Sequence, residues 1–189
     1  MNFNSKKYWE DRYKRGGNSG LGSYGDESEF KSKYINKLIS EKNIKTINDF
    51  GCGDGNQISL LKGFDKYVGY DVSETAILNC KKKFENEKQF VFVNHISKMK
   101  SSDLTMSLDV VYHIIEDDVY HEYMNNLFGL SLKYVLIYSI DSDSLRSGVE
   151  HMKYRKFSTW VLKNKSDFKL TEFYPYIKEN NVGFYLFEK

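Results

Sequence analysis

Three glycines and two acids lie within or directly after two short apolar runs. Gly51, Gly53 and Gly55 follow the run TINDF directly. Asp49 lies inside that run, and Asp71 ends the next one, KYVGYD. Glycine-rich turns after a strand let the backbone approach a nucleotide-like ligand closely. A carboxylate about 20 residues after the first one can accept both hydroxyls of a ribose. This pattern predicts a ribose-containing ligand.

The acid before the glycines narrows the choice of ligand. A dinucleotide fingerprint would carry a third glycine where this chain has Asn56. The Asp49 carboxylate would repel a pyrophosphate, whereas it suits the ammonium of an amino-acid moiety. S-adenosylmethionine has a ribose, a cationic amino-acid end and no pyrophosphate, so it fits these residues.

Strand-like and helix-like runs alternate along the chain. Helices are expected at 5–15, 29–42, 56–64, 73–87 and 117–132. Strands are expected at 45–50, 66–71, 89–94, within 103–114, and at 133–140, 167–177 and 181–189. Such alternation, with nearly all-apolar strands, predicts a Rossmann-like doubly wound α/β fold. Its sheet should be seven-stranded and mostly parallel, with a C-terminal antiparallel hairpin.

Length and composition predict one domain of ordinary size. The chain has 189 residues, of which 40% are apolar, and a formal net charge of +2. That charge does not favour nucleic acid as a partner. Without an export signal or a long apolar run, we expect a cytoplasmic protein with no membrane insertion, either a monomer or a homodimer. The two cysteines, Cys52 and Cys80, lack metal-ligand spacing, so no metal is expected.

The first 28 residues differ from the remainder, 29–189, which should form the globular domain. Residues 16–28 are rich in glycine and serine, so they predict a loop. We interpret residues 1–28 as a helix and a lid loop over the ligand, lined by Tyr8, Trp9, Arg12 or Tyr13. The alternative is a disordered tail, which the aromatic side chains do not favour.

Several motifs together resemble those of class I S-adenosylmethionine-dependent methyltransferases. DFGCGDG looks like their first motif, VGYDVS like their second, and DLTMSLDVVYH is similar to their fourth strand. The resemblance covers roughly residues 30–189. The residues that it implies for the cofactor are Tyr13, Asp49, Gly51, Cys52, Gly53, Gly55, Asn56, Asp71, Val72, Asn94, Leu108 and Asp109. Asn94 stands where the family usually contacts adenine, but the acid often found there is missing.

The outer segments resemble a narrower group, small bacterial methyltransferases of surface-polysaccharide (capsule) synthesis. YWEDRYKRGGNSGLGSYG, SLDVVYHIIEDD and HMKYRKFSTWV carry this second resemblance. It implies an acceptor that is a sugar, a nucleotide-linked sugar or a phosphate-derived decoration. We therefore expect methyl transfer to an oxygen of a small polar or anionic acceptor.

Methyl transfer to a hydroxyl needs a positioned acceptor and a proton acceptor. His113 is the first candidate for the general base, because imidazole titrates near neutral pH. Asp109 could contact the ligand, orient His113 or act as the base itself, and His151 is a further candidate. The alternative for His113 is a capping or loop contact without catalysis. Tyr112 and Tyr138 are expected beside the acceptor.

The run EHMKYRKF brings Lys153 and Arg155 close together after the fifth expected strand. The functional interpretation is an anionic acceptor, with the Arg155 guanidinium bound to a phosphate or carboxylate. The alternative is an exposed basic surface without a ligand.

Other classes of protein fit the sequence less well. Amino-methylating DNA enzymes resemble one another in an Asn/Asp-Pro-Pro-aromatic motif, where this chain has SLDVVYH. Asp49 and Asn56 disfavour a nicotinamide oxidoreductase, and the intact glycine turn with Asp71 disfavours a methyltransferase-like binding domain without catalysis. A protein or peptide acceptor remains an open alternative.

Overall fold

The computed structural model describes residues 3–145, 147–177 and 182–189, which form one seven-stranded sheet with helices on both faces. The strand order is β3-β2-β1-β4-β5-β7-β6, and β7 runs antiparallel to both of its neighbours. The strands are β1 (Thr46–Phe50), β2 (Lys66–Tyr70), β3 (Phe90–Val93), β4 (Ser102–Leu108), β5 (Ser131–Ile140), β6 (Lys169–Ile177) and β7 (Val182–Glu188).

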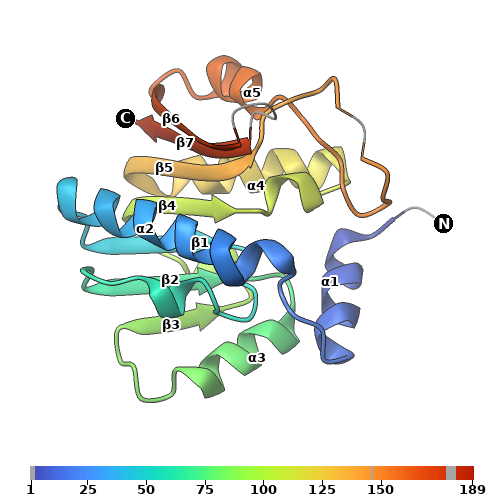
Figure 1. The fold of residues 1–189 in the computed structure, drawn as a ribbon, viewed down its shortest axis with the longest axis vertical. Helices are drawn as coiled ribbons and strands as arrows, with labels where there is room; N and C mark the ends of the chain where they lie inside the picture. The colour runs from blue at the N-terminus through green and yellow to red at the C-terminus, as the bar shows by residue number, and fades with distance from the viewer. Residues whose placement is uncertain (1–2, 146, 178–181) are drawn as a thin grey trace.

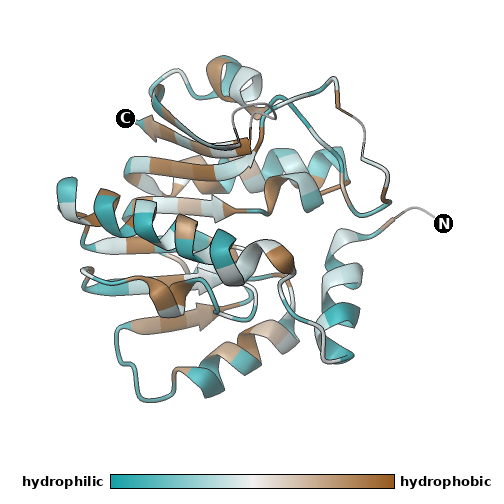
Figure 2. Ribbon diagram, viewed as in Figure 1, coloured by the Kyte–Doolittle hydropathy of each residue, from teal (hydrophilic) through white to brown (hydrophobic). Residues whose placement is uncertain are grey.

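Two apolar cores hold helices against the two faces of the sheet (Figures 1 and 2). One face packs against Ile35 and Leu38 of α2 and against Cys80 of α3. The other packs against Met124 and Leu127 of α4, and also against α5. The helices are α1 (Ser5–Lys14), α2 (Gly25–Glu41), α3 (Glu74–Lys83), α4 (Asp117–Gly129) and α5 (Phe157–Asn164), and the 3-10 turns are η1 (Leu21–Ser23), η2 (Ile58–Leu60), η3 (Ile96–Lys98) and η4 (Val111–His113).

The strand order places a topological switch point between β1 and β4, where ligands of doubly wound sheets bind. α1 stands across the carboxyl ends of the parallel strands at this edge (Figure 1). The N-terminal segment (residues 3–24) therefore lies over the position that the glycine turn predicts for a ligand. No helix in the described ranges is long and apolar enough to span a membrane.

The predicted fold class is confirmed, one local prediction is wrong, and one helix was not predicted. A helix was expected at 56–64, but only the single turn η2 forms, because the backbone becomes extended at Leu61 and left-handed at Gly63 (φ +88°). The sequence reading also missed α5, whose N-terminus is capped by the Asp141 carboxylate through Ser158. The turn expected between β6 and β7 lies outside the described residues.

Candidate active site

The glycine turn after β1 has a left-handed backbone conformation in which residues with a Cβ atom are strained. Gly53 has a φ of +55°, in the left-handed region. A Cβ atom there would lie 2.2 Å from the Ser19 hydroxyl and 2.8 Å from the Tyr13 hydroxyl. Glycine is thus required both by the turn and by the close packing of the N-terminal segment on it.

Asp71 ties the end of β2 to this turn. Its carboxylate is buried and accepts hydrogen bonds from the main-chain N–H of Gly53 (3.0 Å) and of Ser73 (2.8 Å). Burial raises the pKa of Asp71 to about 6, although these hydrogen bonds oppose the shift. Asp71 also lines the larger of the two cavities described below, so its carboxylate is placed to accept the hydroxyls of a ribose.

Asp49 is a buried acid with one oxygen lacking a partner. Its Oδ2 accepts a hydrogen bond from the Tyr67 hydroxyl (2.7 Å), whereas its Oδ1 has no protein partner among the described residues. Burial raises the pKa of Asp49 to about 7. Gln57 Oε1 likewise lacks a partner, and both side chains line a small cavity next to Lys31. Unsatisfied buried acceptors fit an ammonium group, so the residues suit the amino-acid end of S-adenosylmethionine.

We expect the affinity for S-adenosylhomocysteine to rise with pH between about pH 6 and 8. Asp49, with a pKa of about 7, must lose its proton before its carboxylate can pair with the ligand's ammonium. Well below that pKa the Kd should therefore rise about tenfold for each unit of falling pH. Titration calorimetry across this range measures the slope.

The matched variant for this measurement is Asp49→Asn, which keeps the shape of the side chain without its charge. It should bind more weakly and lose the pH dependence. A wild-type Kd that is constant from pH 6 to 8 would mean that Asp49 does not pair with the ligand's ammonium.

A cavity of about 350 Å³ opens beside the glycine turn, at the switch point. Its lining combines residues from β2, β4, α1, α4 and the loops that follow the strands. The predicted cofactor residues in this lining are Tyr13, Gly51, Gly53, Asp71, Val72, Leu108 and Asp109, and it also includes His113.

Five of the predicted cofactor residues are absent from the lining of this cavity, among them Asp49. Cys52 lines the small cavity of Asp49, Gly55 packs against the Phe84 ring, and the Asn56 amide donates to the Ser23 carbonyl (2.7 Å). Asn94 lines a different groove, at the outer edge of β3. The structure therefore does not bring Asn94 to the main cavity.

His113 is fixed in the cavity wall by ring contacts and one hydrogen bond. Its Nδ1 lies 2.9 Å from the main-chain carbonyl of His151. Because a carbonyl can only accept, Nδ1 of the neutral ring carries the proton and Nε2 keeps a lone pair. The Trp9 ring packs edge-on against the His113 ring, with their centroids 4.9 Å apart, and the His151 ring stacks on it with a centroid distance of 5.5 Å. Burial lowers the pKa of His113 to about 4, so the ring is neutral at pH 7.

Asp109 forms a polar cluster that sequence reasoning did not find in full. The buried Lys31 ammonium of α2 pairs with its Oδ2, and the Tyr112 hydroxyl donates to its Oδ1 (2.9 Å). The Tyr138 hydroxyl donates to Glu27 (3.3 Å), and burial and the Asp109 charge raise the pKa of Glu27. Asp109 has a φ of +60°, which is uncommon outside glycine and is found at functional sites.

Lys31 and Glu27 were missed, although Lys31 had a signal in the sequence. It stands in helical register with Ile35 and Leu38, so the apolar face of α2 carries one lysine. A lysine at such a position needs a buried acid as its partner.

Arg155 and Lys153 are paired within the protein. The Arg155 guanidinium donates to the carbonyls of Ile114 (2.6 Å) and Ile115 (2.9 Å) and to Asp117 (2.9 Å). Lys153 pairs with the same Asp117 carboxylate at 2.7 Å. Neither residue lines the cavity. Both instead join the loop after β5 to the start of α4.

We expect Arg155→Ala to lower the free energy of unfolding by about 1–3 kcal/mol, because two main-chain carbonyls lose their donors. The Kd for S-adenosylhomocysteine should not change. Urea denaturation and calorimetry test these two expectations. If Arg155→Ala has unchanged stability and a raised KM for the acceptor, Arg155 binds the acceptor as the sequence predicted.

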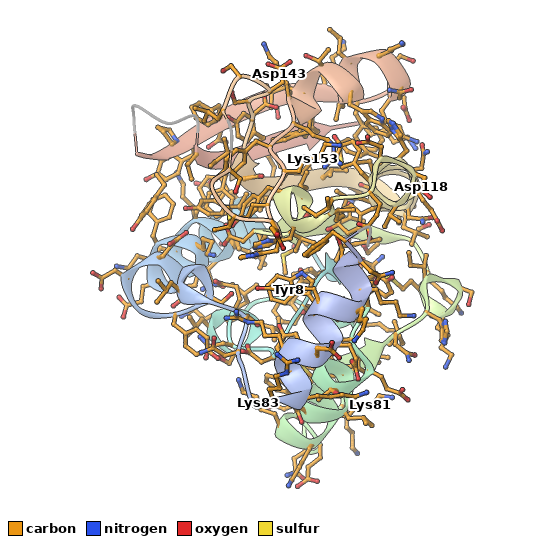
Figure 3. The ribbon with its side chains drawn as sticks, turned by 90° about the vertical axis from the view of Figure 1, so that its right-hand side faces the viewer. Tyr8, Lys81, Lys83, Asp118, Asp143 and Lys153 are labelled. Carbon is orange, nitrogen blue, oxygen red and sulfur yellow. The ribbon has the colours of Figure 1, made fainter. Side chains whose placement is uncertain are left out.

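α1 is attached to the rest of the protein at its first residue and near its middle. Ser5 donates to the Glu116 carboxylate through its main-chain N–H (2.8 Å) and its hydroxyl (2.6 Å). Glu10 accepts from the hydroxyls of Ser73 (2.7 Å) and Thr75 (2.9 Å) at the start of α3. These bonds lower the pKa of Glu10 to about 2. Figure 3 looks onto this edge, with Tyr8 labelled on α1.

The loop after α1 is bonded to the glycine turn. The Ser19 N–H and the Tyr24 hydroxyl both donate to the Asp54 carboxylate, at 2.9 and 2.7 Å. The Asp54 N–H in turn donates to the Ser19 hydroxyl (3.1 Å). The segment thus covers the turn in the conformation that the structure shows.

Comparisons with known proteins agree with this geometry. Residues 48–127 match a family model described as a methyltransferase domain. No curated protein matches the chain in sequence.

Solved structures share the whole fold at low sequence identity. The N-methyltransferase NodS from Bradyrhizobium japonicum WM9, in complex with S-adenosylhomocysteine, gives a TM-score of 0.73 at 12% identity, over 99% of each chain. Magnesium protoporphyrin IX methyltransferase (ChlM) from Synechocystis PCC 6803, with bound S-adenosylmethionine, gives 0.70 at 14%, over 100% of this chain and 99% of its own. The methyltransferase domain of bacterial CtHen1 gives 0.67 at 17%, over 84% and 96%.

These solved structures establish the fold, and the family match lies on the segment that carries the glycine turn, Asp71 and Asp109. The predictions of an enzyme and of its cofactor are confirmed. The chain is an S-adenosylmethionine-dependent methyltransferase with the class I fold.

Proposed function

We propose that the enzyme methylates a hydroxyl of a small polar acceptor, with His113 as the general base. One observation carries the proposal: His113 lines the cavity as a neutral ring whose Nδ1 proton is donated to a carbonyl. Bound S-adenosylmethionine supplies an activated methyl group on a sulfonium. His113 Nε2 takes the hydroxyl proton as the oxygen bonds to the methyl carbon and the carbon–sulfur bond breaks.

The proposed acceptor is a sugar or a nucleotide-linked sugar of surface-polysaccharide synthesis, which the sequence resemblance implies. Among such acceptors we favour methylation at a neutral hydroxyl. Arg155 and Lys153, the cations expected to hold an anionic group, are paired with Asp117. A phosphate-type acceptor would therefore have to displace that pairing.

A second candidate is an amine acceptor, which the charges around Asp109 favour. Glu27 and Asp109 place two carboxylates near a single lysine, Lys31. A Cβ atom on Gly22 would lie 2.9 Å from Asp109 Oδ2 and 3.3 Å from Glu27 Oε1, so the two acids lie beneath the same turn. A cluster with surplus negative charge can attract an ammonium group.

The test uses S-adenosylmethionine with a ¹³C-labelled methyl group and two matched acceptors, UDP-glucose and UDP-glucosamine. Release of S-adenosylhomocysteine reports turnover, and the ¹³C resonance of the product distinguishes an O-methyl from an N-methyl group. We expect an O-methyl product from both. An N-methyl product from UDP-glucosamine alone would favour the amine candidate. No turnover with either, while the cofactor still binds, would count against sugar nucleotides.

The N-terminal segment is our proposed lid. Its hydrogen bonds to Glu116, Ser73 and Asp54 support closure over the cofactor. In this proposal the bonds, which join the segment to Glu116, Ser73 and Asp54, break before the cofactor enters or leaves. The proposal predicts that Glu10→Gln, which weakens one attachment, increases the rate of cofactor release in stopped-flow measurements.

A further inference from the structure

The lining of the main cavity includes both Asp71, after β2, and residues of α4. This part of the lining includes Val72 and Ile96, and, from α4, Glu122 and Asn126. Residues 94–101 join β3 to β4 with only the short turn η3, so no helix separates this part of the cavity from α4. We call this part the α4 chamber.

The amino-acid end, the ribose and the adenine follow one another in S-adenosylmethionine, and this order places the adenine in the α4 chamber. The glycine turn with Asp49 suits the amino-acid end, and Asp71 suits the ribose. The base projects from the ribose away from the amino-acid end, and the apolar lining that can receive it includes Val72 and Ile96. The faces of adenine are flat and apolar, whereas its edge carries an exocyclic amine that donates hydrogen bonds.

Glu122 and Asn126 are the polar side chains of α4 that meet this chamber. They are one helical turn apart, so they share one face of α4. Within the described part of the chain, neither side chain makes a hydrogen bond or ion pair with the protein. The other acids of the lining are already bonded: Asp71 to Gly53, Asp109 to Lys31 and Glu116 to Ser5.

The end of β3 does not supply a polar group to the chamber. Asn94, the predicted adenine contact, lines a separate groove together with Lys81, Lys88 and Lys98. A base in the α4 chamber therefore meets Glu122 before it meets Asn94.

We propose that Glu122 recognises the adenine of the cofactor by accepting a hydrogen bond from its exocyclic amine, with Asn126 beside it at the edge of the base. The inference depends on the cofactor and not on the identity of the methyl acceptor. Glu122 would thereby determine which nucleoside the enzyme accepts.

The experiment compares S-adenosylhomocysteine with S-inosylhomocysteine, in which an oxygen replaces the amine. The wild type should bind the adenosyl ligand at least about tenfold more tightly in calorimetry, because the inosyl oxygen faces a carboxylate. In Glu122→Gln the amide can donate to that oxygen. The ratio of the two Kd values should therefore fall about tenfold.

Asp118→Asn is the matched control, because Asp118 lies on the same helix and is exposed, as Glu122 is, but is absent from the cavity lining (Figure 3). It should keep the wild-type ratio. Equal affinities of the wild type for the two ligands would overturn the proposal. So would a wild-type ratio in a Glu122→Gln variant that still binds S-adenosylhomocysteine.

Discussion

His113→Ala should lower kcat by roughly 10²–10⁴-fold, the usual contribution of a positioned general base. The Kd for S-adenosylmethionine should change little, because the groups that suit the cofactor's amino-acid end and ribose are Asp49 and Asp71. The His113 ring is already in its base form at pH 7, since burial lowers its pKa to about 4. Steady-state kinetics and calorimetry on the same preparation separate the two effects.

The pH profile provides a second measurement on this residue. Protonation of His113 removes the lone pair of Nε2, so kcat should fall as the pH drops towards about 4 and should not depend on this group above about pH 6. In the unfolded chain the pKa of His113 returns to its ordinary value near 6.5, so between about pH 4 and 6.5 the unfolded chain binds this proton more readily than the native protein does. The free energy of unfolding should therefore also decrease as the pH falls from about 6.5 to 4.

His121→Ala is the control for losing an imidazole. His121 lies on α4, exposed, where its Nδ1 accepts a hydrogen bond from Trp160 (2.7 Å), and it does not line the cavity. It should keep the wild-type kcat. If His113→Ala also keeps the wild-type kcat, the base is Asp109 or His151, or the acceptor needs none.

The fold was predictable because strand patterns and turn chemistry agree along most of the chain. β1 and β2 are short apolar runs that end at the glycine turn and at Asp71, so their carboxyl ends place both features at one edge. The expected helix at 56–64 failed because Leu61 is buried in an extended conformation. Local helical spacing cannot reveal that a tertiary contact wins over propensity.

The geometry of the proposed cofactor side of the site follows from the sequence better than that of the acceptor side. Asp49 and Asp71 lie near the carboxyl ends of their own strands, so spacing alone locates them. Arg155 and its partner Asp117 lie 38 positions apart and meet only through the fold. No spacing rule gives the partner of a largely buried arginine. The anion site was therefore predicted from a positive charge that Asp117 already neutralises within the protein.

Gly53→Arg should abolish binding of S-adenosylhomocysteine. The substitution places a side chain at a φ of +55°, with its Cβ atom 2.2 Å from the Ser19 hydroxyl. The turn, the N-terminal segment and the hydrogen bond from Gly53 to Asp71 must all shift. For the wild type, a ligand at about 100 times its Kd stabilises the protein by roughly 2.7 kcal/mol. In thermal unfolding, the resulting shift of several degrees should be missing from the variant.

Gly25→Arg separates backbone strain from the loss of the site. Gly25 has a φ of +59°, but a Cβ atom there would meet no other atom within 4 Å. The cost of the left-handed backbone, about 1 kcal/mol, is therefore common to both variants, and only Gly53→Arg adds the clash. Gly25→Arg should keep the full ligand-induced shift at a lower starting Tm. If Gly53→Arg keeps that shift as well, the glycine turn does not hold the cofactor. The position of the adenine in the α4 chamber, which was inferred from that turn, would then have no support.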